Sequence, residues 1–485
     1  MAYPRQYFSS EFWKCGDSEE KYCLGYATQL SEGCPCSGIS GVAIFSAIFD
    51  PSTTPGSWNN WAMEGYLLND TADAVMWECP DLFPLFDDSN IWMVKYSIGP
   101  GPSYSQPWGT PGPRDYYITG SYSPKSDILA FERDPFQWEA AMNRSSLISL
   151  DTGTFYASKT YQVDGVGRIL WGWIPEERLV DSHGNPYGWA GAMALPRLIL
   201  PYKIQGKDSW YVRTPPLQYA LDQLYISESA VEYQNLSLAT DTEMLFLTDV
   251  TGTQMEILLY IDVENMHRGD KCGVRVLSSL VNSESVVSQD TEFTDIGIQY
   301  LGNQMNSLVT SVELYVDTQY STANLSSPVN RTTCTAHPLD LDQEIYFSEI
   351  NGAKSIQLQI LLDQSVIESF IASGSHAITR RSYPSFPLTS NNVQLFSASN
   401  SGNFSTCNFK FIKVTKLRDA NITQSDEDSN SKHSDDNGND NLSSAIIGII
   451  VASTIVGVGL IGIGGYFLMK KKSSTSDTEE MLNSM

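Results

Sequence analysis

One glutamate lies among aromatic side chains in a way that suits proton-transfer chemistry. Glu78 stands in the run MWECPDLF at 76–83, beside Trp77, Cys79 and Phe83. Apolar surroundings disfavour the ionised carboxylate and raise its pKa toward the range in which a general acid works. The alternative interpretation is structural, with Glu78 acting only as a hydrogen-bond acceptor.

Other catalytic chemistries lack their sequence patterns. The chain has no P-loop, HExxH or GxSxG sequence and only five histidines, so phosphoryl transfer, zinc hydrolysis and Ser-His catalysis are not indicated. GVGLIG at 457–462 matches GxGxxG, but it lies inside a long apolar segment, which excludes a dinucleotide site. Cys34 and Cys36 fit no structural zinc pattern. No cofactor and no metal site is predicted.

The composition favours an all-β protein. The chain carries 56 acidic and 30 basic residues, a net charge of −26 that repels phosphate backbones, so no nucleic-acid partner is expected. Charged residues make up only 18%, aromatic residues reach 11%, and there are 35 glycines and 23 prolines. Such a chain is too apolar to be disordered and too rich in turn residues for a helical bundle.

Short aromatic and β-branched runs predict many strands in a first domain at 1–216. The clearest runs cover 41–49, 91–98, 115–122, 154–163 and 168–174. Their spacing is typical of a propeller or barrel. A connector at 217–234 follows, in which residues 217–227 show helix-like spacing of apolar side chains.

A second β domain is predicted at 235–416. MLFLTDV and QMEILLYIDV, joined through the Gly252 turn, are expected to form a hairpin. Further strand-like runs make this region similar to a sandwich of two sheets. Beyond it, the acidic and polar residues 417–444 predict a disordered stalk.

The C-terminal part predicts a membrane anchor. Residues 445–469 carry no charge and are long enough to span a bilayer, and Lys470, Lys471 and Lys472 follow at once. The positive-inside bias places the tail, 470–485, in the cytosol and the rest outside the cell or in a vacuolar lumen. Eight glycosylation sequons precede the span, at Asn69, Asn143, Asn235, Asn324, Asn330, Asn403, Asn421 and Asn441. The eight cysteines are then free to form disulfides, whose pairing the spacing leaves open.

Five successive motifs stand out along the chain: WECPDLF at 77–83, DTGTFYASKTY at 151–161, RILWGW at 168–173, GWAGAMALPR at 188–197 and ILLDQSVIESFIASGSHAITRRSYP at 360–384. These motifs resemble those of glycoside hydrolase family 32, the invertases, fructan hydrolases and fructosyltransferases. Their order and approximate spacing match from Phe12 to about Leu417. The resemblance implies a five-bladed β-propeller followed by a β-sandwich.

The resemblance also implies cleavage of β-fructofuranosyl bonds, in sucrose or fructans, with retention of configuration. By position, Glu78 is the acid/base, paired with an Asp nucleophile about 5 Å away. Substrate-binding roles are expected for Trp77, Asp151, Lys159 and Trp171, with propeller packing as the alternative. Asp363, Ser365 and Glu368 are expected to be structural or interdomain residues, with Arg380 and Arg381 as partners for them or for the propeller.

The chain departs from the family pattern at the nucleophile. It contains no Asn-Asp-Pro string, and the Arg133-Asp134-Pro135 triplet follows the Glu78 motif where the family has a variable loop, so we interpret it as accidental. We therefore expect the chain to begin after the first blades and to lack the nucleophile. The alternatives are a catalytically inactive, membrane-anchored sugar-binding module and a non-functional gene fragment. Nothing in the sequence supports or excludes a homo-oligomer.

Overall fold

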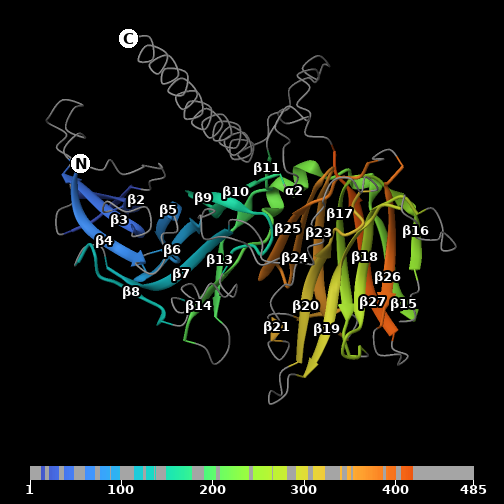
Figure 1. Ribbon diagram of the computed structural model, residues 1–485. Helices are drawn as coiled ribbons and strands as arrows, with labels where there is room; N and C mark the ends of the chain where they lie inside the picture. The colour runs from blue at the N-terminus through green and yellow to red at the C-terminus, as the bar shows by residue number, and fades with distance from the viewer. Residues whose placement is uncertain are drawn as a thin grey trace, which may run out of the picture. The chain divides into compact units, whose positions relative to one another are not determined.

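The computed structural model is an all-β protein (Figure 1). It describes residues 12–16, 21–31, 38–48, 61–70, 77–87, 89–98, 114–123, 127–135, 137, 149–176, 191–203, 208–239, 244–264, 266–280, 291–303, 310–322, 339–340, 347–350, 353–385, 389–399 and 406–418. Each of the five strand-like runs expected in the first domain coincides with a strand, so these sequence predictions are confirmed.

The first two sheets are four-stranded antiparallel meanders in chain order. The β1–β4 sheet contains β1 (Phe12–Lys14), β2 (Lys21–Ser31), β3 (Gly38–Ile48) and β4 (Ala62–Asp70). The β5–β8 sheet contains β5 (Trp77–Pro84), β6 (Ile91–Ile98), β7 (Arg114–Tyr122) and β8 (Phe131–Arg133). Such repeated meanders are the blades of a β-propeller.

The third sheet is built on β10. This strand (Gly167–Ile174) pairs with β9 (Tyr156–Val163) on one side and with β11 (Ala192–Met193) and β12 (Arg197–Leu198) on the other. β13 (Leu200–Lys203) and β14 (Trp210–Arg213) form a separate hairpin. The β5 and β9 strands are in contact, which brings residues about 80 positions apart together.

Aromatic packing holds the first domain together. The Trp77 ring, 2% exposed, stacks on Tyr96 at 4.0 Å between centroids, and Trp92 meets Tyr122 edge to face at 5.0 Å. Offset stacks and edge-to-face pairs are the arrangements that aromatic rings prefer. A disulfide joins Cys15 and Cys23 across the β1–β2 pair.

The connector contains the helix that the sequence predicts, in a shorter form. α2 covers Gln218–Leu224 and ends because Tyr225 adopts an extended conformation with ψ of 137°. A single 3-10 turn, η3 (Ser227–Ser229), then leads into the second domain.

The second domain is a sandwich of two antiparallel sheets (Figure 1). The seven-stranded sheet contains β15 (Val231–Ala239), β17 (Gln254–Asp262), β22 (Phe347–Ile350), β23 (Ala353–Asp363), β24 (Val366–Ile371), β25 (His376–Arg381) and β27 (Thr406–Lys416). The six-stranded sheet contains β16 (Met244–Thr251), β18 (Lys271–Ser278), β19 (Thr294–Asn303), β20 (Thr310–Asp317), β21 (Leu339–Asp340) and β26 (Asn392–Ala398).

The inner faces of the two sheets form one apolar core. Ile257 on β17, Ile360 on β23 and Val274 on β18 are fully buried in it. A second disulfide, Cys272–Cys407, joins β18 of one sheet to β27 of the other. The prediction of disulfides is therefore confirmed for these two pairs.

The expected hairpin through Gly252 is wrong. β16 pairs with β26 in the six-stranded sheet, whereas β17 pairs with β23 and β27 in the seven-stranded sheet. The turn therefore crosses from one sheet to the other. Local turn chemistry suggested the pairing, and the tertiary partners override it.

Of the predicted stalk at 417–444, Leu417 is buried and bridges to Tyr225, and Arg418 is the last described residue. The rest of the stalk, the span at 445–469 and the tail at 470–485 lie outside the described residues. Within the described ranges, no helix is long and apolar enough to cross a membrane. Asn69 lies within β4, and Asn235 is exposed on β15 with a φ of 53°. The other six sequons also lie outside the described part of the chain.

Candidate active site

Glu78 stands at an irregularity in strand β5. It pairs in register with Ser97, but the pairing resumes only at Asp81, opposite Lys95. Of the two residues in between, Cys79 takes the left-handed conformation with φ of 47°. A bulge of this kind redirects a side chain, and bulges are frequent beside active sites. The Glu78 side chain is half-buried as a result.

A tyrosine from the next sheet holds the Glu78 carboxylate. The Tyr156 hydroxyl, on β9, donates a hydrogen bond to Oε2 of Glu78. Burial raises the pKa of Glu78 above its ordinary value, the Tyr156 hydrogen bond opposes that rise, and the negative charge of Asp115 adds to it. A carboxyl with a raised pKa retains a proton that it can donate as a general acid.

A buried charge network lies beneath Glu78. The Lys95 ammonium is fully buried, lies 3.9 Å from Asp81 and 3.8 Å from Asp115, and donates to the Ser158 hydroxyl at 2.9 Å. Lys159 forms an ion pair with Asp81 as well. Two ammonium groups thus balance two carboxylates, as buried charges require.

The same network joins the strands that carry the site. Asp81 accepts a hydrogen bond from the Thr160 amide at 2.8 Å, and Asp115 accepts one from the Ser158 amide at 2.8 Å. These bonds connect β5 and β7 to β9. They fix Tyr156 relative to Glu78, which is the kind of support that a functional carboxyl needs.

The structure places the four expected substrate-binding residues in different environments. The Trp77 ring is a packing element, since it is 2% exposed and stacked on Tyr96. The Lys159 side chain is 35% exposed, but its ammonium group forms an ion pair with Asp81. Trp171 is half-buried and donates from its indole nitrogen to the Tyr161 hydroxyl at 2.9 Å.

Asp151 belongs to a buried network between the first domain and the sandwich. Its carboxylate accepts from Arg197 at 2.9 Å and from the Thr379 hydroxyl at 2.7 Å. Arg197 also donates to Glu368 at 2.7 Å. Its guanidinium lies between the rings of Phe155 and Phe370, at 4.3 Å and 4.7 Å from their centroids. Trp77 and Asp151 are thus both buried and bonded within the protein, and their substrate-binding role stays a prediction.

The residues expected to be structural or interdomain divide between the interface and the sandwich. Glu368 lies there, and Arg381 pairs with Glu176 of the first domain at 3.1 Å. Asp363, by contrast, is exposed and accepts from Gln254 within the sandwich at 2.9 Å.

Sequence reasoning missed Tyr156, Lys95 and Trp173. Trp173 is 38% exposed, and its ring centroid lies 6.5 Å from that of Tyr156. A bulge between Trp171 and Trp173 turns the second indole outward. Lys95 could have been found, because a lysine inside the apolar run IWMVKYSI signals a buried charge that needs partners.

Two further observations concern a possible metal site and the Arg-Asp-Pro triplet. Among the described residues, no group of three or more His, Cys, Asp or Glu side chains could hold a metal ion. Asp134 of the Arg-Asp-Pro triplet accepts a hydrogen bond from the Gln137 amide at 2.9 Å, which is a local turn contact. The fold and site together define a propeller-plus-sandwich protein with one carboxyl suited to proton transfer.

Comparisons with known proteins identify the family. The description "Glycosyl hydrolases family 32 N-terminal domain" matches residues 55–211, and "Glycosyl hydrolases family 32 C terminal" matches residues 221–411. The chain belongs to glycoside hydrolase family 32.

Relatives and solved structures agree with this family. An insoluble β-fructofuranosidase isoenzyme of Arabidopsis thaliana is 29% identical over 329 residues, which is 64% of this chain and 54% of that protein. A fructan 6-exohydrolase of Beta vulgaris is 24% identical over 366 residues, covering 74% and 56%. The crystal structure of fructan 1-exohydrolase IIa from Cichorium intybus superposes with a TM-score of 0.59 at 20% identity, covering 84% of this chain and 71% of that one. The chain spans about half the length of the curated relatives it matches.

Proposed function

We propose that the chain belongs to a glycosidase that cleaves β-fructofuranosyl bonds with retention of configuration, and that Glu78 is its acid/base. One observation carries the proposal: Glu78 is half-buried at a strand bulge, with a raised pKa and a hydrogen bond from Tyr156. Family membership gives such a carboxyl a chemical context.

The mechanism follows from general acid/base chemistry. Protonated Glu78 donates its proton to the glycosidic oxygen as the bond to the fructosyl carbon breaks, and the leaving sugar departs with that proton. A second carboxylate forms the covalent fructosyl intermediate. The ionised Glu78 then takes a proton from water, whose oxygen attacks the fructosyl carbon; the bond to the second carboxylate breaks, and fructose is released. We assign no residue of the printed sequence to the nucleophile.

Sucrose and fructans are the proposed substrates. The relatives include proteins named β-fructofuranosidase and others named fructan 6-exohydrolase or fructan 1-exohydrolase. The names of the relatives thus refer both to β-fructofuranosides and to fructans. The exposed Trp173, whose ring lies 6.5 Å from that of Tyr156, supplies apolar surface near the candidate acid, and the half-buried Trp171 lies on the same strand. The flat face of a sugar ring can bind to such surface.

The Glu78→Gln variant tests the proposed role. Gln keeps the size of the side chain and removes its proton chemistry, so turnover of sucrose and 1-kestose should fall at least a hundredfold while the thermal unfolding temperature stays within a few degrees. Glu132→Gln, at an exposed position on β8, is the control and should keep full turnover. A fall of less than tenfold in Glu78→Gln rejects the assignment. A natural protein with no fructose release at all favours the sugar-binding alternative.

We also propose that residues 445–469 anchor the protein in a membrane, with the glycosylated part outside the cell or in a vacuolar lumen and the Lys470–Lys472 side in the cytosol. The uncharged segment, the following lysines and the eight preceding sequons support this proposal. Alkaline carbonate extraction should leave the protein in the membrane fraction. Glycosidase treatment should lower its apparent mass, and release into the soluble fraction would contradict the proposal.

A further inference from the structure

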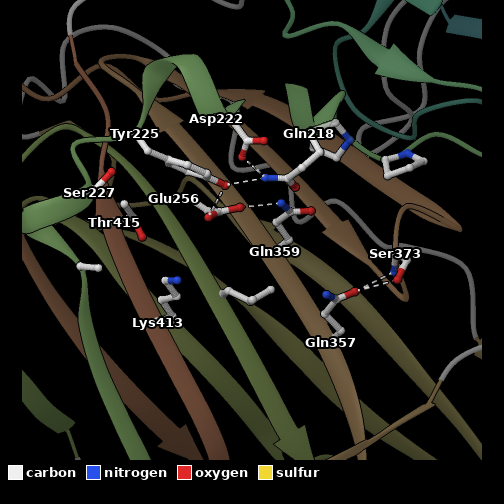
Figure 2. Close-up of a pocket in the computed structure, with 14 residues that line it drawn as sticks. Gln218, Asp222, Tyr225, Ser227, Glu256, Gln357, Gln359, Ser373, Lys413 and Thr415 are labelled. Atoms are coloured by element: carbon white, nitrogen blue, oxygen red, sulfur yellow. Dashed lines mark hydrogen bonds between the residues drawn. The ribbon is translucent and has the colours of Figure 1, made fainter. Parts of the chain in front are cut away.

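The outer face of the seven-stranded sheet carries a cavity of about 560 Å³, far along the chain from Glu78 (Figure 2). Helix α2 and the connector that follows it form one wall, and strands β17, β23 and β27 form the floor. This volume lies in the range of about 300 to 1,000 Å³ that is typical of small-molecule sites.

Strand alternation explains why the floor is polar. Ile257 and its inward neighbours enter the sandwich core, so Glu256 and Leu258 point outward on β17. Leu258 is directly opposite both Gln359 on β23 and Lys413 on β27, as the strand registers show. Three adjacent strands therefore place an amide, an ammonium and a carboxylate on the same open face.

Hydrogen bonds hold the centre of the cavity in place. Glu256 is 7% exposed, and its two carboxylate oxygens accept from the Tyr225 hydroxyl at 2.8 Å and from the Gln359 amide at 2.6 Å. Burial, followed by the charge of Glu256, raises the pKa of Tyr225 well above its ordinary value, so this hydroxyl remains a donor. These side chains are fixed in advance, which lowers the entropic cost of binding a ligand.

Both rims carry further donors and acceptors. On α2, Gln218 donates to Asp222 at 2.8 Å. At the opposite rim, the Gln357 side-chain oxygen accepts from the Ser373 hydroxyl at 2.9 Å. Figure 2 shows these two pairs on either side of the Glu256 group. The two rims thus place carboxylate, amide and hydroxyl groups around one opening.

We infer that this cavity is a binding site for a neutral oligosaccharide. Sugar hydroxyls both donate and accept hydrogen bonds, which suits a lining of amides, hydroxyls and carboxylates. Pro215, Pro216 and Leu258 add apolar surface for the C–H faces of sugar rings. Asp222 and Glu256 outnumber Lys413, so an anionic ligand is disfavoured. The inference does not rest on the proposed catalytic role, because no lining residue belongs to the candidate active site.

Calorimetric titration of the full chain tests the site. The protein carries the Glu78→Gln substitution, so that no ligand is hydrolysed during the titration. The probes are inulin-type and levan-type fructo-oligosaccharides, cello-oligosaccharides, xylo-oligosaccharides and an anionic oligogalacturonate. We expect saturable binding of at least one neutral probe. Binding confined to the fructans identifies the substrate polymer as the ligand, and binding of the other neutral chains identifies a different glycan.

A matched pair of double variants locates the binding. Gln218→Ala with Asp222→Ala removes two exposed lining groups on α2 and should weaken binding at least tenfold. Gln223→Ala with Glu228→Ala changes two exposed neighbours outside the cavity and should leave the Kd unchanged. Gln357→Ala repeats the test on the opposite rim. Unchanged binding in both lining variants, no binding of any neutral probe, or tighter binding of oligogalacturonate overturns the inference.

Discussion

The Tyr156 hydroxyl donates a hydrogen bond to the Glu78 carboxylate, although the two residues lie on different sheets. The bond favours the ionised form, whereas burial favours the protonated form and is the larger effect. The pKa of Glu78 is therefore raised, but by less than burial alone would raise it. Tyr156 sets how readily the proposed acid gives up its proton.

Removing that hydroxyl should shift the pH dependence of catalysis. In Tyr156→Phe the opposing hydrogen bond is lost, so the pKa of Glu78 rises further. The basic limb of the kcat/KM profile for sucrose, which reports the protonated acid, should move to higher pH. Tyr161→Phe, on the same strand, removes the acceptor of Trp171 instead and should leave that limb in place. A profile that moves to lower pH in Tyr156→Phe would contradict the geometry.

The raised pKa of Glu78 also predicts a pH-dependent stability change. Between the unfolded and folded pKa values the folded state binds a proton that the unfolded state has lost, so stability falls as pH rises through this window. The Glu78→Gln variant has no titrating carboxyl at this position, so it lacks this loss of stability at higher pH. Its unfolding temperature should exceed that of the unaltered protein at neutral pH, and the difference should shrink below the unfolded pKa of a glutamate. A constant difference at all pH values would show that Glu78 has no raised pKa.

Arg197 should be among the residues most sensitive to substitution. Arg197→Met leaves Asp151 and Glu368 buried without their common cation, which costs about 3 to 5 kcal/mol in the free energy of unfolding. Glu232→Gln breaks the exposed ion pair between Glu232 and Lys413 and should lower the free energy of unfolding by at most about 1 kcal/mol. Chemical denaturation measures both values. Equal effects would mean that the buried network contributes no more than a surface pair.

The two disulfides should differ in their contribution to stability. Cys272 and Cys407 are 135 residues apart, and closing such a loop in the unfolded chain corresponds to about 5 kcal/mol. Cys15 and Cys23 are 8 residues apart, which corresponds to about 2.5 kcal/mol. Paired Cys→Ala variants of each bridge, compared by denaturant unfolding, should follow that order. The reverse order would show that chain entropy does not dominate.

Local patterns predicted the strands well and their partners poorly. The IWMVKYSI run became β6 because a continuous apolar stretch is stable only when both faces are buried. The turn at Gly252 suggested a hairpin, yet β16 and β17 joined different sheets. Pairing depends on β26 and β23, which lie more than 90 residues further on, and no short-range signal reports them.

The candidate site was predictable at Glu78 and less so around it. The aromatic run indicated a perturbed carboxyl, and the half-buried environment of Glu78 agrees with that indication. Asp151 looked equally suited to binding sugar, but its partners Arg197 and Thr379 come from 46 and 228 residues away. Tyr156 gave no signal, since its role depends on the contact between β5 and β9.

Rescue of Glu78→Gln by azide tests the central claim most directly. With β-fructofuranosyl fluoride, the leaving group needs little protonation, and azide can attack the fructosyl intermediate without a general base. The account predicts that turnover of the fluoride falls much less than turnover of sucrose, that azide restores it, and that NMR identifies β-fructofuranosyl azide with retained configuration. Equal loss on both substrates with no azide product would show that Glu78 is not the acid/base.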